Sequence, residues 1–459
     1  MKSRSIVEPT VGCPCIRIDR DDSEANTSKA CRFDLPTDSP FEFGVLVGRV
    51  LERSHRELVV RVEISQSQRY VAERRFILLK GALMVRYWMS VLLLAVGLQA
   101  TSAQDVADSK ARPFRLTLPP TIYAVPDVDM SLYFENTVLV ADGQKVSFEV
   151  ECSLGKVEPR RWTIKATAQE VGTVPLKLKV KDEAGKVVEE AQTHVRVVPG
   201  NSGHDKDITL LIVGDSLTHA SAYPNEIARL LSLPSNPKWQ MIGTHQPAGV
   251  KPGVVHEGYG GWTWAAFNTK FDPKNPEPGY RGSSPFVFGV GEPPQAKLDV
   301  ARYFAERTGG KTPNFITVML GINDCFGFNP DDAVNLDVRI DGVFKEADKL
   351  IAEFRRAAPE AQIGVCLTTP GNSRDAAFYA NYKDRYPRWG WRRIQHRLVE
   401  KQLLHFLKRD HEKVFVIPTQ LNLDATDGYP EDNGVHPNAA GYQQIGKTIY
   451  AWLKARMAG

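Results

Sequence analysis

The second half of the chain alternates short apolar runs with longer amphipathic stretches. The runs are rich in β-branched residues and bounded by glycine or charge, which predicts buried parallel strands at 208–213, 239–243, 314–320, 362–368 and 413–417. Stretches with helical spacing of apolar residues separate the runs, at 222–232, 333–357, 391–408 and 438–455. This alternation predicts a three-layer α/β domain with a mainly parallel sheet over residues 207–459.

A different pattern precedes this domain, over residues 104–199. Apolar and polar residues alternate with a period of two in short segments at 145–150, 161–166, 174–180 and 193–198. Turn signals separate the segments, which predicts a small all-β domain, an immunoglobulin-like sandwich. A carbohydrate-binding role and a plain packing role are both open, and the packing role is favoured. Residues 200–206 have the composition of a linker.

An export signal lies inside the sequence. An apolar core at 90–98 follows Arg86 and precedes small residues at 101–103, the layout of a secretory signal peptide over 84–103. We expect translation to begin at Met84, which makes residues 1–83 a non-native or disordered extension; a genuine extension with a signal anchor is the alternative. The mature protein is then secreted or periplasmic, with no stable membrane span.

Four short blocks carry candidate chemistry. Gly-Asp-Ser-Leu at 214–217 and Gly-Ile-Asn-Asp at 321–324 each follow an apolar run directly. Ser216 and Asn323 therefore fall at the carboxyl ends of strands, where open α/β sheets place their sites. The other two blocks are Gly-Gly-Trp-Thr at 260–263 and Gly-Val-His-Pro at 434–437.

These residue types fit nucleophilic catalysis. A serine hydroxyl needs a base to become a nucleophile, and the tetrahedral intermediate needs donors for its oxyanion. His436 can take the proton, while the Asn323 amide and a backbone N–H at Gly261 can donate. Each block alone also has a structural explanation: a helix N-cap, a Gly-Gly turn, an Asx turn or a loop histidine. Their joint occurrence in this order favours catalysis.

The set resembles the SGNH (GDSL-type) hydrolases, a family of serine esterases and lipases, over about residues 207–453. The resemblance implies a flavodoxin-like fold and an acyl-enzyme mechanism without cofactor or metal. It implies Ser216 as the nucleophile and His436 as the general base. It also implies an oxyanion hole made by the N–H groups of Ser216 and Gly261 and the amide of Asn323.

One position departs from the family pattern. The family places an aspartate three residues before the histidine, where this chain has Asn433, and Asp432 lies one residue earlier. Three arrangements stay open: Asp432 orients His436 through a local loop shift, a backbone carbonyl does so in a Ser-His dyad, or the uncharged Asn433 leaves a slow enzyme. Asp215 and Asp324 are expected to make structural hydrogen bonds.

Two insertions and two indoles bear on the substrate. Residues 271–294 follow the Gly261 block and are expected to border the site, and residues 373–393 carry aromatic rings among cations. Such rings stack on sugars and such cations meet carboxylates or sulfates, although a solvated surface loop is favoured. Trp262 and Trp264 are candidate substrate-binding residues.

We expect a carbohydrate O-acetylesterase, with a small-molecule or polysaccharide ester as its partner. A lipase, thioesterase or arylesterase of the same family is the nearest alternative. A non-catalytic glycan-binding protein on a decayed hydrolase scaffold is the alternative from another class. The sequence leaves the oligomeric state open.

Composition narrows the picture only slightly. The chain is 42% apolar and 24% charged with a net charge of +4, typical of a soluble globular protein and without a case for nucleic acid. After the signal only Cys152, Cys325 and Cys366 remain, too few for a disulfide scaffold. His245 and His256 are too isolated in sequence to indicate a metal site.

Overall fold

The structure is a computed structural model. It describes five strands before residue 78, and residues 116–458 apart from 141–143, 280–281 and 384–386. Residues Met1–Ser109 and Lys110–Gly459 form two separate compact units. The predicted signal peptide, 84–103, lies outside the described residues.

The first unit contains a five-stranded antiparallel sheet in chain order. Its strands lie within residues 1–83, the segment predicted to be a non-native or disordered extension. They are β1 (Ile16–Ile18), β2 (Ser28–Phe33), β3 (Leu46–Ser54), β4 (Glu57–Ile64) and β5 (Val71–Ile77).

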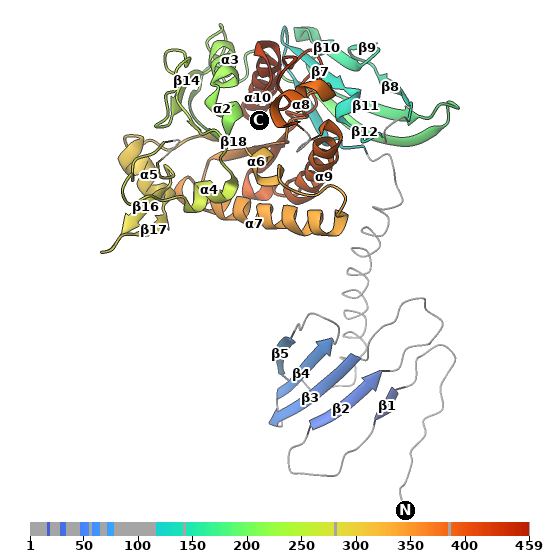
Figure 1. Cartoon of the computed structure of the whole chain (residues 1–459), viewed down its shortest axis with the longest axis vertical. Coiled ribbons are helices and arrows are strands. Elements are labelled where there is room, and N and C mark those ends of the chain that lie inside the picture. Colours follow the sequence, from blue (N-terminus) through green and yellow to red (C-terminus); the bar gives the residue numbers. More distant parts are fainter. Residues whose placement is uncertain are drawn as a thin grey trace, which may run out of the picture. The chain divides into compact units, whose positions relative to one another are not determined.

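The second unit is built on a six-stranded parallel sheet (Figure 1). Its order is β14-β13-β18-β19-β20, and β15 pairs with the carboxyl end of β13. The strands are β13 (Asp207–Gly214), β14 (Lys238–Ile242), β15 (Glu257–Gly258), β18 (Phe315–Met319), β19 (Gln362–Cys366) and β20 (Val414–Ile417). The predicted α/β fold with a parallel sheet is confirmed.

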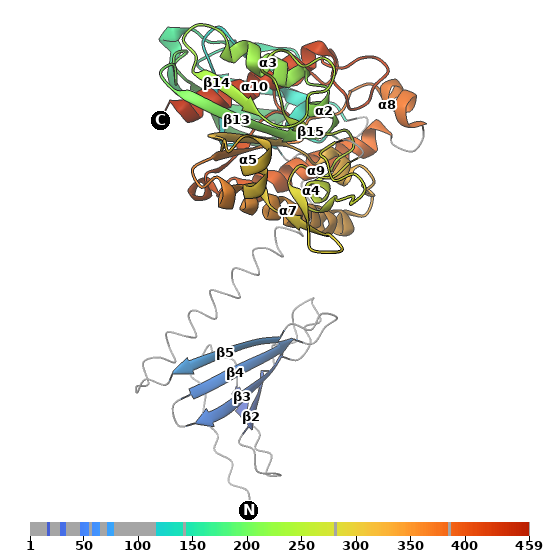
Figure 2. The same cartoon turned by 90° about the vertical axis from the view of Figure 1, so that its left-hand side faces the viewer.

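Helices cover both faces of this sheet, which gives three layers. Figure 2 shows α3 and α10 on one face, and α4, α5, α7 and α9 on the other. The bounds are α2 (Ser216–His219), α3 (Ala222–Leu231), α4 (Trp264–Thr269), α5 (Val300–Arg307), α6 (Ile322–Cys325), α7 (Ala333–Ala357), α8 (Asp375–Tyr382), α9 (Arg388–Phe406) and α10 (Ala439–Met457). The four helices predicted from periodicity are confirmed.

The central strands are apolar because both of their faces are covered. Leu210, Leu211, Ile212 and Val213 of β13 have no exposed surface. A β-carbon on Gly364 in β19 would lie only 2.5 Å from Ile417 Cδ1, so the sheet and its helices pack without spare room.

The insertion at 271–294 continues into a two-stranded hairpin, β16 (Val287–Val290) and β17 (Gln295–Leu298). Phe286, just before the hairpin, is fully buried against Tyr303 of α5 and Phe354 of α7. The insertion therefore packs on the helical layer.

Residues 116–197 form two smaller sheets. One has the order β7-β10-β9 and the other β6-β12-β11-β8, all antiparallel except for the parallel pair β6 and β12. The strands are β6 (Thr121–Ala124), β7 (Asp129–Tyr133), β8 (Ser147–Cys152), β9 (Lys156–Glu158), β10 (Arg161–Lys165), β11 (Gly172–Lys181) and β12 (Val187–Val197). Four of the strands match predicted segments.

This β-rich part is joined firmly to the α/β part. The side chain of Leu421, from the α/β part, belongs to the apolar core of the two small sheets. Asn136 Nδ2 donates to the carbonyls of Gln420 and Leu423 at 2.8 and 2.7 Å, and Asn422 Oδ1 accepts from Ser131 N at 2.7 Å. The segment 420–424 is thus held from outside its own domain.

None of the helices in the described residues combines the length and the apolar character that crossing a membrane requires.

Replacing Leu211 by alanine tests the importance of the central sheet. We expect the free energy of unfolding to fall by about 2–5 kcal/mol, because a buried cavity replaces the side chain. Leu404→Ala is the matched control, since Leu404 is 76% exposed and should cost less than about 0.5 kcal/mol. Equal losses in denaturant unfolding would contradict the assigned burial.

Candidate active site

Ser216 lies where β13 ends and α2 begins. Asp215 is the N-cap of α2, and its Oδ1 accepts from Leu217 N at 3.0 Å. A β-carbon on Gly214 would lie 2.0 Å from Thr218 Oγ1 and 2.8 Å from Met319 O, so only glycine fits at this strand end. The predicted N-cap is therefore present, and it fixes the backbone that presents the Ser216 hydroxyl.

His436 lies beside Ser216, although 220 residues separate them. His436 Nε2 is 2.9 Å from Ser216 Oγ. The histidine precedes α10, whose N-cap Asn438 accepts from Gly441 N at 3.1 Å. The structure thus brings together the two residues that the sequence predicts as nucleophile and base.

Asn433 is the residue that meets the other imidazole nitrogen. Its Oδ1 is 3.1 Å from His436 Nδ1 and also accepts from Val435 N at 3.2 Å and His436 N at 3.0 Å. Because two backbone N–H groups require an acceptor there, the oxygen of the amide must face the imidazole. His436 Nδ1 therefore donates to Asn433, and Nε2 is free to accept from Ser216. Asp432 is exposed.

Two asparagines from the insertion at 373–393 and its edge hold this loop. Asn372 Nδ2 donates to the carbonyls of Pro430 and Asn433 at 2.7 and 3.0 Å, and Asn372 N donates to Gly434 O at 2.8 Å. Asn381 Oδ1 accepts from Gly434 N at 2.9 Å. These contacts were not predicted, because no motif marks either asparagine.

The predicted oxyanion donors are neighbours in space. Asn323 Nδ2 donates to Trp262 O at 3.0 Å and lies 3.4 Å from Asp215 Oδ2, which places the amide between the Gly261 and Ser216 segments. Gly261 is exposed with a φ of +78°, and a β-carbon there would meet nothing within 4 Å. The left-handed backbone favours glycine here, and the place where a side chain would begin is open.

Two buried carboxyl groups lie beneath the site. Burial raises the pKa of Asp215 to about 7, and the nearby Asp324 adds to the effect. Burial also raises the pKa of Asp324 to about 7, and its Oδ1 accepts from Trp264 N at 3.0 Å. Near neutral pH this pair therefore does not carry two full negative charges. Two such charges would destabilise an oxyanion nearby.

Burial also lowers the pKa of His436 below its ordinary value. The imidazole therefore stays neutral, and able to accept a proton, at mildly acidic pH.

The side chains of the two candidate substrate-binding tryptophans are buried. Trp262 and Trp264 are 3% and 2% exposed. The Trp262 ring stacks on Tyr259, with ring centroids 4.4 Å apart, and Lys270 Nζ lies 4.6 Å from its centroid. Both rings belong to the core, so neither offers a free face to a sugar.

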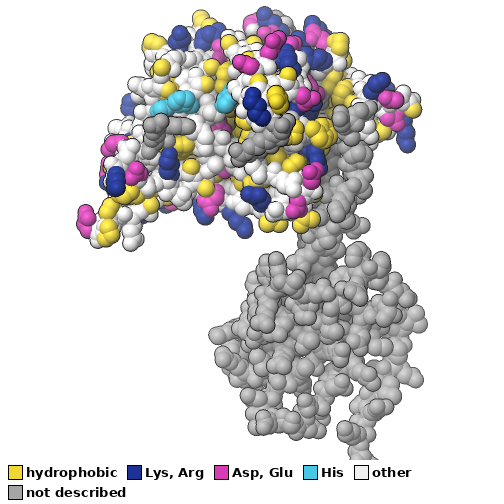
Figure 3. All heavy atoms as spheres, in the orientation of Figure 1, with side chains coloured by type: hydrophobic (Ala, Val, Ile, Leu, Met, Phe, Trp, Pro, Cys, Tyr) yellow, Lys and Arg dark blue, Asp and Glu magenta, His cyan; other side chains and the backbone are white. Residues whose placement is uncertain are grey.

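A histidine cluster escaped prediction. His245 and His256 pair through their backbones, and His219 Nδ1 lies 2.9 Å from His245 Nε2. Burial is the main cause that lowers the pKa of His245 to about 4 and of His256 to about 3, so both rings are neutral at pH 7. Histidine side chains reach the surface on the face shown in Figure 3. No group of three metal-binding side chains occurs among the residues that the structure describes.

The family comparison identifies the class of protein. Residues 212–444, just over half of the chain, match the GDSL-like lipase/acylhydrolase family. The chain belongs to this family, as its resemblance to the SGNH (GDSL-type) hydrolases predicts. It is accordingly a carboxylic ester hydrolase. No curated protein matches the chain.

Several solved structures resemble the chain at low identity. An aryl esterase from M. smegmatis is 16% identical, with 54% of this chain and 99% of that chain covered and a TM-score of 0.32. A carbohydrate acetylesterase from Sinorhizobium meliloti is 15% identical, with 54% of this chain and 99% of that chain covered and a TM-score of 0.31. An acetyl-xylooligosaccharide esterase from Geobacillus is 15% identical, with 53% of this chain and 92% of that chain covered and a TM-score of 0.28. Similarity at this level carries no information on the substrate.

The orientation of Asn433 makes a prediction about the tautomer of His436. We expect the neutral imidazole to carry its proton on Nδ1, because Asn433 Oδ1 is fixed as an acceptor. Nitrogen-15 NMR of the imidazole at pH 7 to 8 measures the protonated nitrogen directly. In Asn433→Leu the preference should weaken, and a wild-type protein with its proton on Nε2 would contradict the hydrogen-bond assignment.

Proposed function

We propose that the chain hydrolyses esters in two steps, with Ser216 as the nucleophile and His436 as the general base. The supporting observation is the continuous line of contacts from Ser216 Oγ through His436 to Asn433 Oδ1, at 2.9 and 3.1 Å. Such a nucleophile, base and orienting group is what activates a serine hydroxyl.

In this mechanism Ser216 Oγ bonds to the acyl carbon while His436 Nε2 takes the hydroxyl proton. The N–H groups of Ser216 and Gly261 and the Asn323 amide stabilise the oxyanion. Collapse breaks the bond to the alcohol, which leaves with the proton from His436. Water then attacks the acyl-enzyme by the same path, and the acid is released as Ser216 regains its proton.

Asn433 is the orienting residue in this proposal. In serine proteases, replacing the triad aspartate by asparagine costs about 10⁴ in turnover because the wrong imidazole tautomer results. Here the N–H groups of Val435 and His436 turn the amide oxygen toward the ring, so the productive tautomer is kept. Compared with an aspartate, Asn433 still lacks a negative charge, and a neutral amide stabilises the imidazolium less than a carboxylate does.

We propose an acetylated carbohydrate as the substrate. The support is the insertion at 373–393, which carries aromatic rings among cations, as recognition of a sugar requires. A polar groove between β10 and the 424–428 segment is lined by none of Ser216, Gly261, Asn323 and His436, so it does not bear on the substrate. A lipase, thioesterase or arylesterase is the alternative, and a lipase needs an apolar acyl groove. The fold similarity to a carbohydrate acetylesterase is compatible with either.

We also propose that the protein is exported through the signal at 84–103, which makes it secreted or periplasmic. Residues 116–197 are proposed to be an immunoglobulin-like sandwich, supported by their three-stranded and four-stranded sheets around one apolar core. In this proposal the sandwich supports the loop of the active site through its bonds to residues 420–424.

Hydrolysis of p-nitrophenyl acetate tests the nucleophile and base. Ser216→Ala and His436→Gln should each lower kcat by about 10³-fold or more, because both act as one unit. His411→Gln is the matched control, since His411 is 76% exposed on its side chain. The wild type should cleave p-nitrophenyl acetate faster than p-nitrophenyl esters of longer acyl chains. Undiminished turnover in Ser216→Ala would refute the mechanism, and faster cleavage of long chains would favour a lipase.

Asn433 and Asp432 are separated by a second comparison. Asn433→Leu should lower kcat by about 10²-fold or more through loss of the tautomer, whereas Asp432→Asn should leave kcat unchanged. In the wild type the acidic limb of kcat/KM against pH should lie below pH 6.5, because the lowered pKa keeps His436 neutral there. Asn433→Asp should move this limb to higher pH. A larger loss in Asp432→Asn would assign the orienting role to Asp432.

A further inference from the structure

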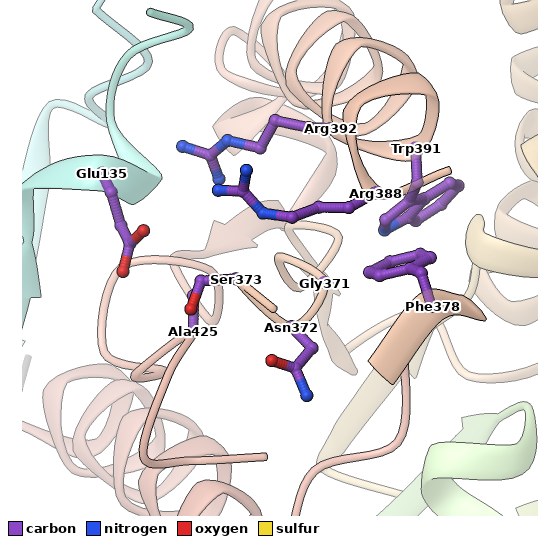
Figure 4. A pocket seen from close by; sticks show the side chains of 9 residues that line it. All are labelled: Glu135, Gly371, Asn372, Ser373, Phe378, Arg388, Trp391, Arg392 and Ala425. Carbon is purple, nitrogen blue, oxygen red and sulfur yellow. The ribbon is translucent and has the colours of Figure 1, made fainter. Parts of the chain in front are cut away.

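A small pocket lies where α9 and the turn at 371–373 face the β-rich part, shown in Figure 4. It encloses about 220 Å³ including its open mouth, and the space at its centre is about that of one water molecule, so a larger group would extend into the mouth. The residues that matter here are Glu135, Asn372, Arg388, Trp391 and Arg392.

Two arginines enter the pocket without a carboxylate at ion-pair distance. Arg388 and Arg392 are one helical turn apart on α9, and their guanidinium groups lie close together in Figure 4. No Asp or Glu in the described residues comes within the 4.0 Å of an ion pair to either. Arg392 donates to Val138 O at 3.2 Å. Burial lowers the pKa of Arg392 to about 10, the charge of Glu135 across the pocket acts in the opposite direction, and Arg392 stays charged at pH 7.

Two other arginines of the same helix are paired with carboxylates. Arg393 donates to Asp331 at 2.6 Å, and Arg397 makes two bonds of 2.6 Å to Asp337. Charges taken out of water are normally paired in this way, because an unpaired one loses its hydration without compensation. The two pocket arginines, which are half-buried, therefore differ from their neighbours in having no carboxylate within ion-pair distance in the described part of the chain.

The indole of Trp391 adds a third donor. Its side chain is 3% exposed, and its Nε1–H has no acceptor within the described part of the chain. Figure 4 shows the indole at the side of the pocket, near Gly371. A β-carbon on Gly371 would lie 3.1 Å from Nε1 and 2.7 Å from Phe378 Cζ, so no side chain fits between them. Buried N–H groups nearly always have an acceptor, so this donor is left for a water molecule or a ligand.

We propose that this pocket binds a carboxylate group between Arg388, Arg392 and the indole N–H of Trp391. Guanidinium groups match the two oxygens of a carboxylate with parallel hydrogen bonds. Glu135 lies on the opposite wall and is 3.6 Å from Arg160. Its negative charge opposes a dianion, so a single carboxylate fits better than sulfate.

Two sources share this chemistry: the acid that ester hydrolysis releases, and the carboxylate of an acidic sugar. Asn372 lines the pocket and also holds the loop of Asn433, so the bound group lies next to the segment that positions His436. Binding itself does not depend on the proposed function, because Arg388, Trp391 and Arg392 take no part in the hydrolytic steps.

The indole N–H resonance of Trp391, assigned with Trp391→Phe, is the local reporter. Sodium acetate, sodium glucuronate and sodium sulfate are titrated against the full chain by nitrogen-15 NMR. Both carboxylates should shift the resonance saturably, and sulfate should bind more weakly. Affinity should fall about 10-fold or more in Arg388→Met and Arg392→Met, as expected for a lost charged hydrogen-bonding pair. Arg393→Met is the matched control and should bind like the wild type.

Equal affinities for acetate and glucuronate would assign the released acid, and tighter glucuronate would assign an acidic sugar. Failure of both carboxylates to shift the resonance, tightest binding of sulfate, or an equal loss in Arg393→Met would overturn the proposal. If the Met variants unfold, Arg388→Lys and Arg392→Lys keep the charge but lose the fork, and should still weaken carboxylate binding. Hydrolysis of p-nitrophenyl acetate by the same samples reports the Ser216 site separately.

Discussion

The geometry of the site depends on one oxygen atom, Asn433 Oδ1. It accepts from the N–H groups of Val435 and His436, and it faces His436 Nδ1 at 3.1 Å. The backbone thereby decides which end of an otherwise ambiguous amide meets the imidazole. In the proposed mechanism this uncharged residue lacks the charge of a carboxylate but keeps the proton of the neutral imidazole on Nδ1.

This oxygen is placed by residues distant in sequence. Asn372 and Asn381 bind the backbone of residues 430–434, while Asn136 and Ser131 of the β-rich part hold residues 420–424 just before them. Ser216, by contrast, is fixed locally by the end of β13 and the cap of α2. The proposed nucleophile is therefore positioned by the sheet, and the proposed base is positioned by loops that several elements hold.

Much of the fold could be predicted from the sequence, because buried positions require apolar residues and therefore recur at a regular spacing. Strands covered on both faces read as unbroken apolar runs, and a helix as long as α7 shows its period clearly. The helix α4 and the hairpin of β16 and β17 lack such a pattern, and α5 carries it over only eight residues, with Val300, Tyr303 and Phe304 on its buried face. They are short, and Phe286 is held by tertiary contacts with Tyr303 and Phe354 rather than by local preference.

The candidate site divides in the same way. Ser216 and His436 could be matched from motifs, whereas the choice between Asp432 and Asn433 depends on a loop path that Asn372 sets from 61 residues away. Trp262 and Trp264 show the converse: an aromatic residue next to a functional glycine looks the same in sequence whether its ring faces a ligand or the core. For Trp262, the packing of its ring against Tyr259 and Phe267 shows that it faces the core.

The seating of Leu421 among the two small sheets has a consequence for how this protein can be cut and recombined. A hydrolase portion separated at residues 200–206 would carry an apolar side chain and, within residues 420–423, four carbonyl or amide oxygens whose partners had been removed. Those groups lie on the strand-to-loop segment that leads to His436. The smallest transferable unit is therefore the β-rich part together with the α/β part, and exchange of either alone between homologues requires a matching surface at residues 420–424.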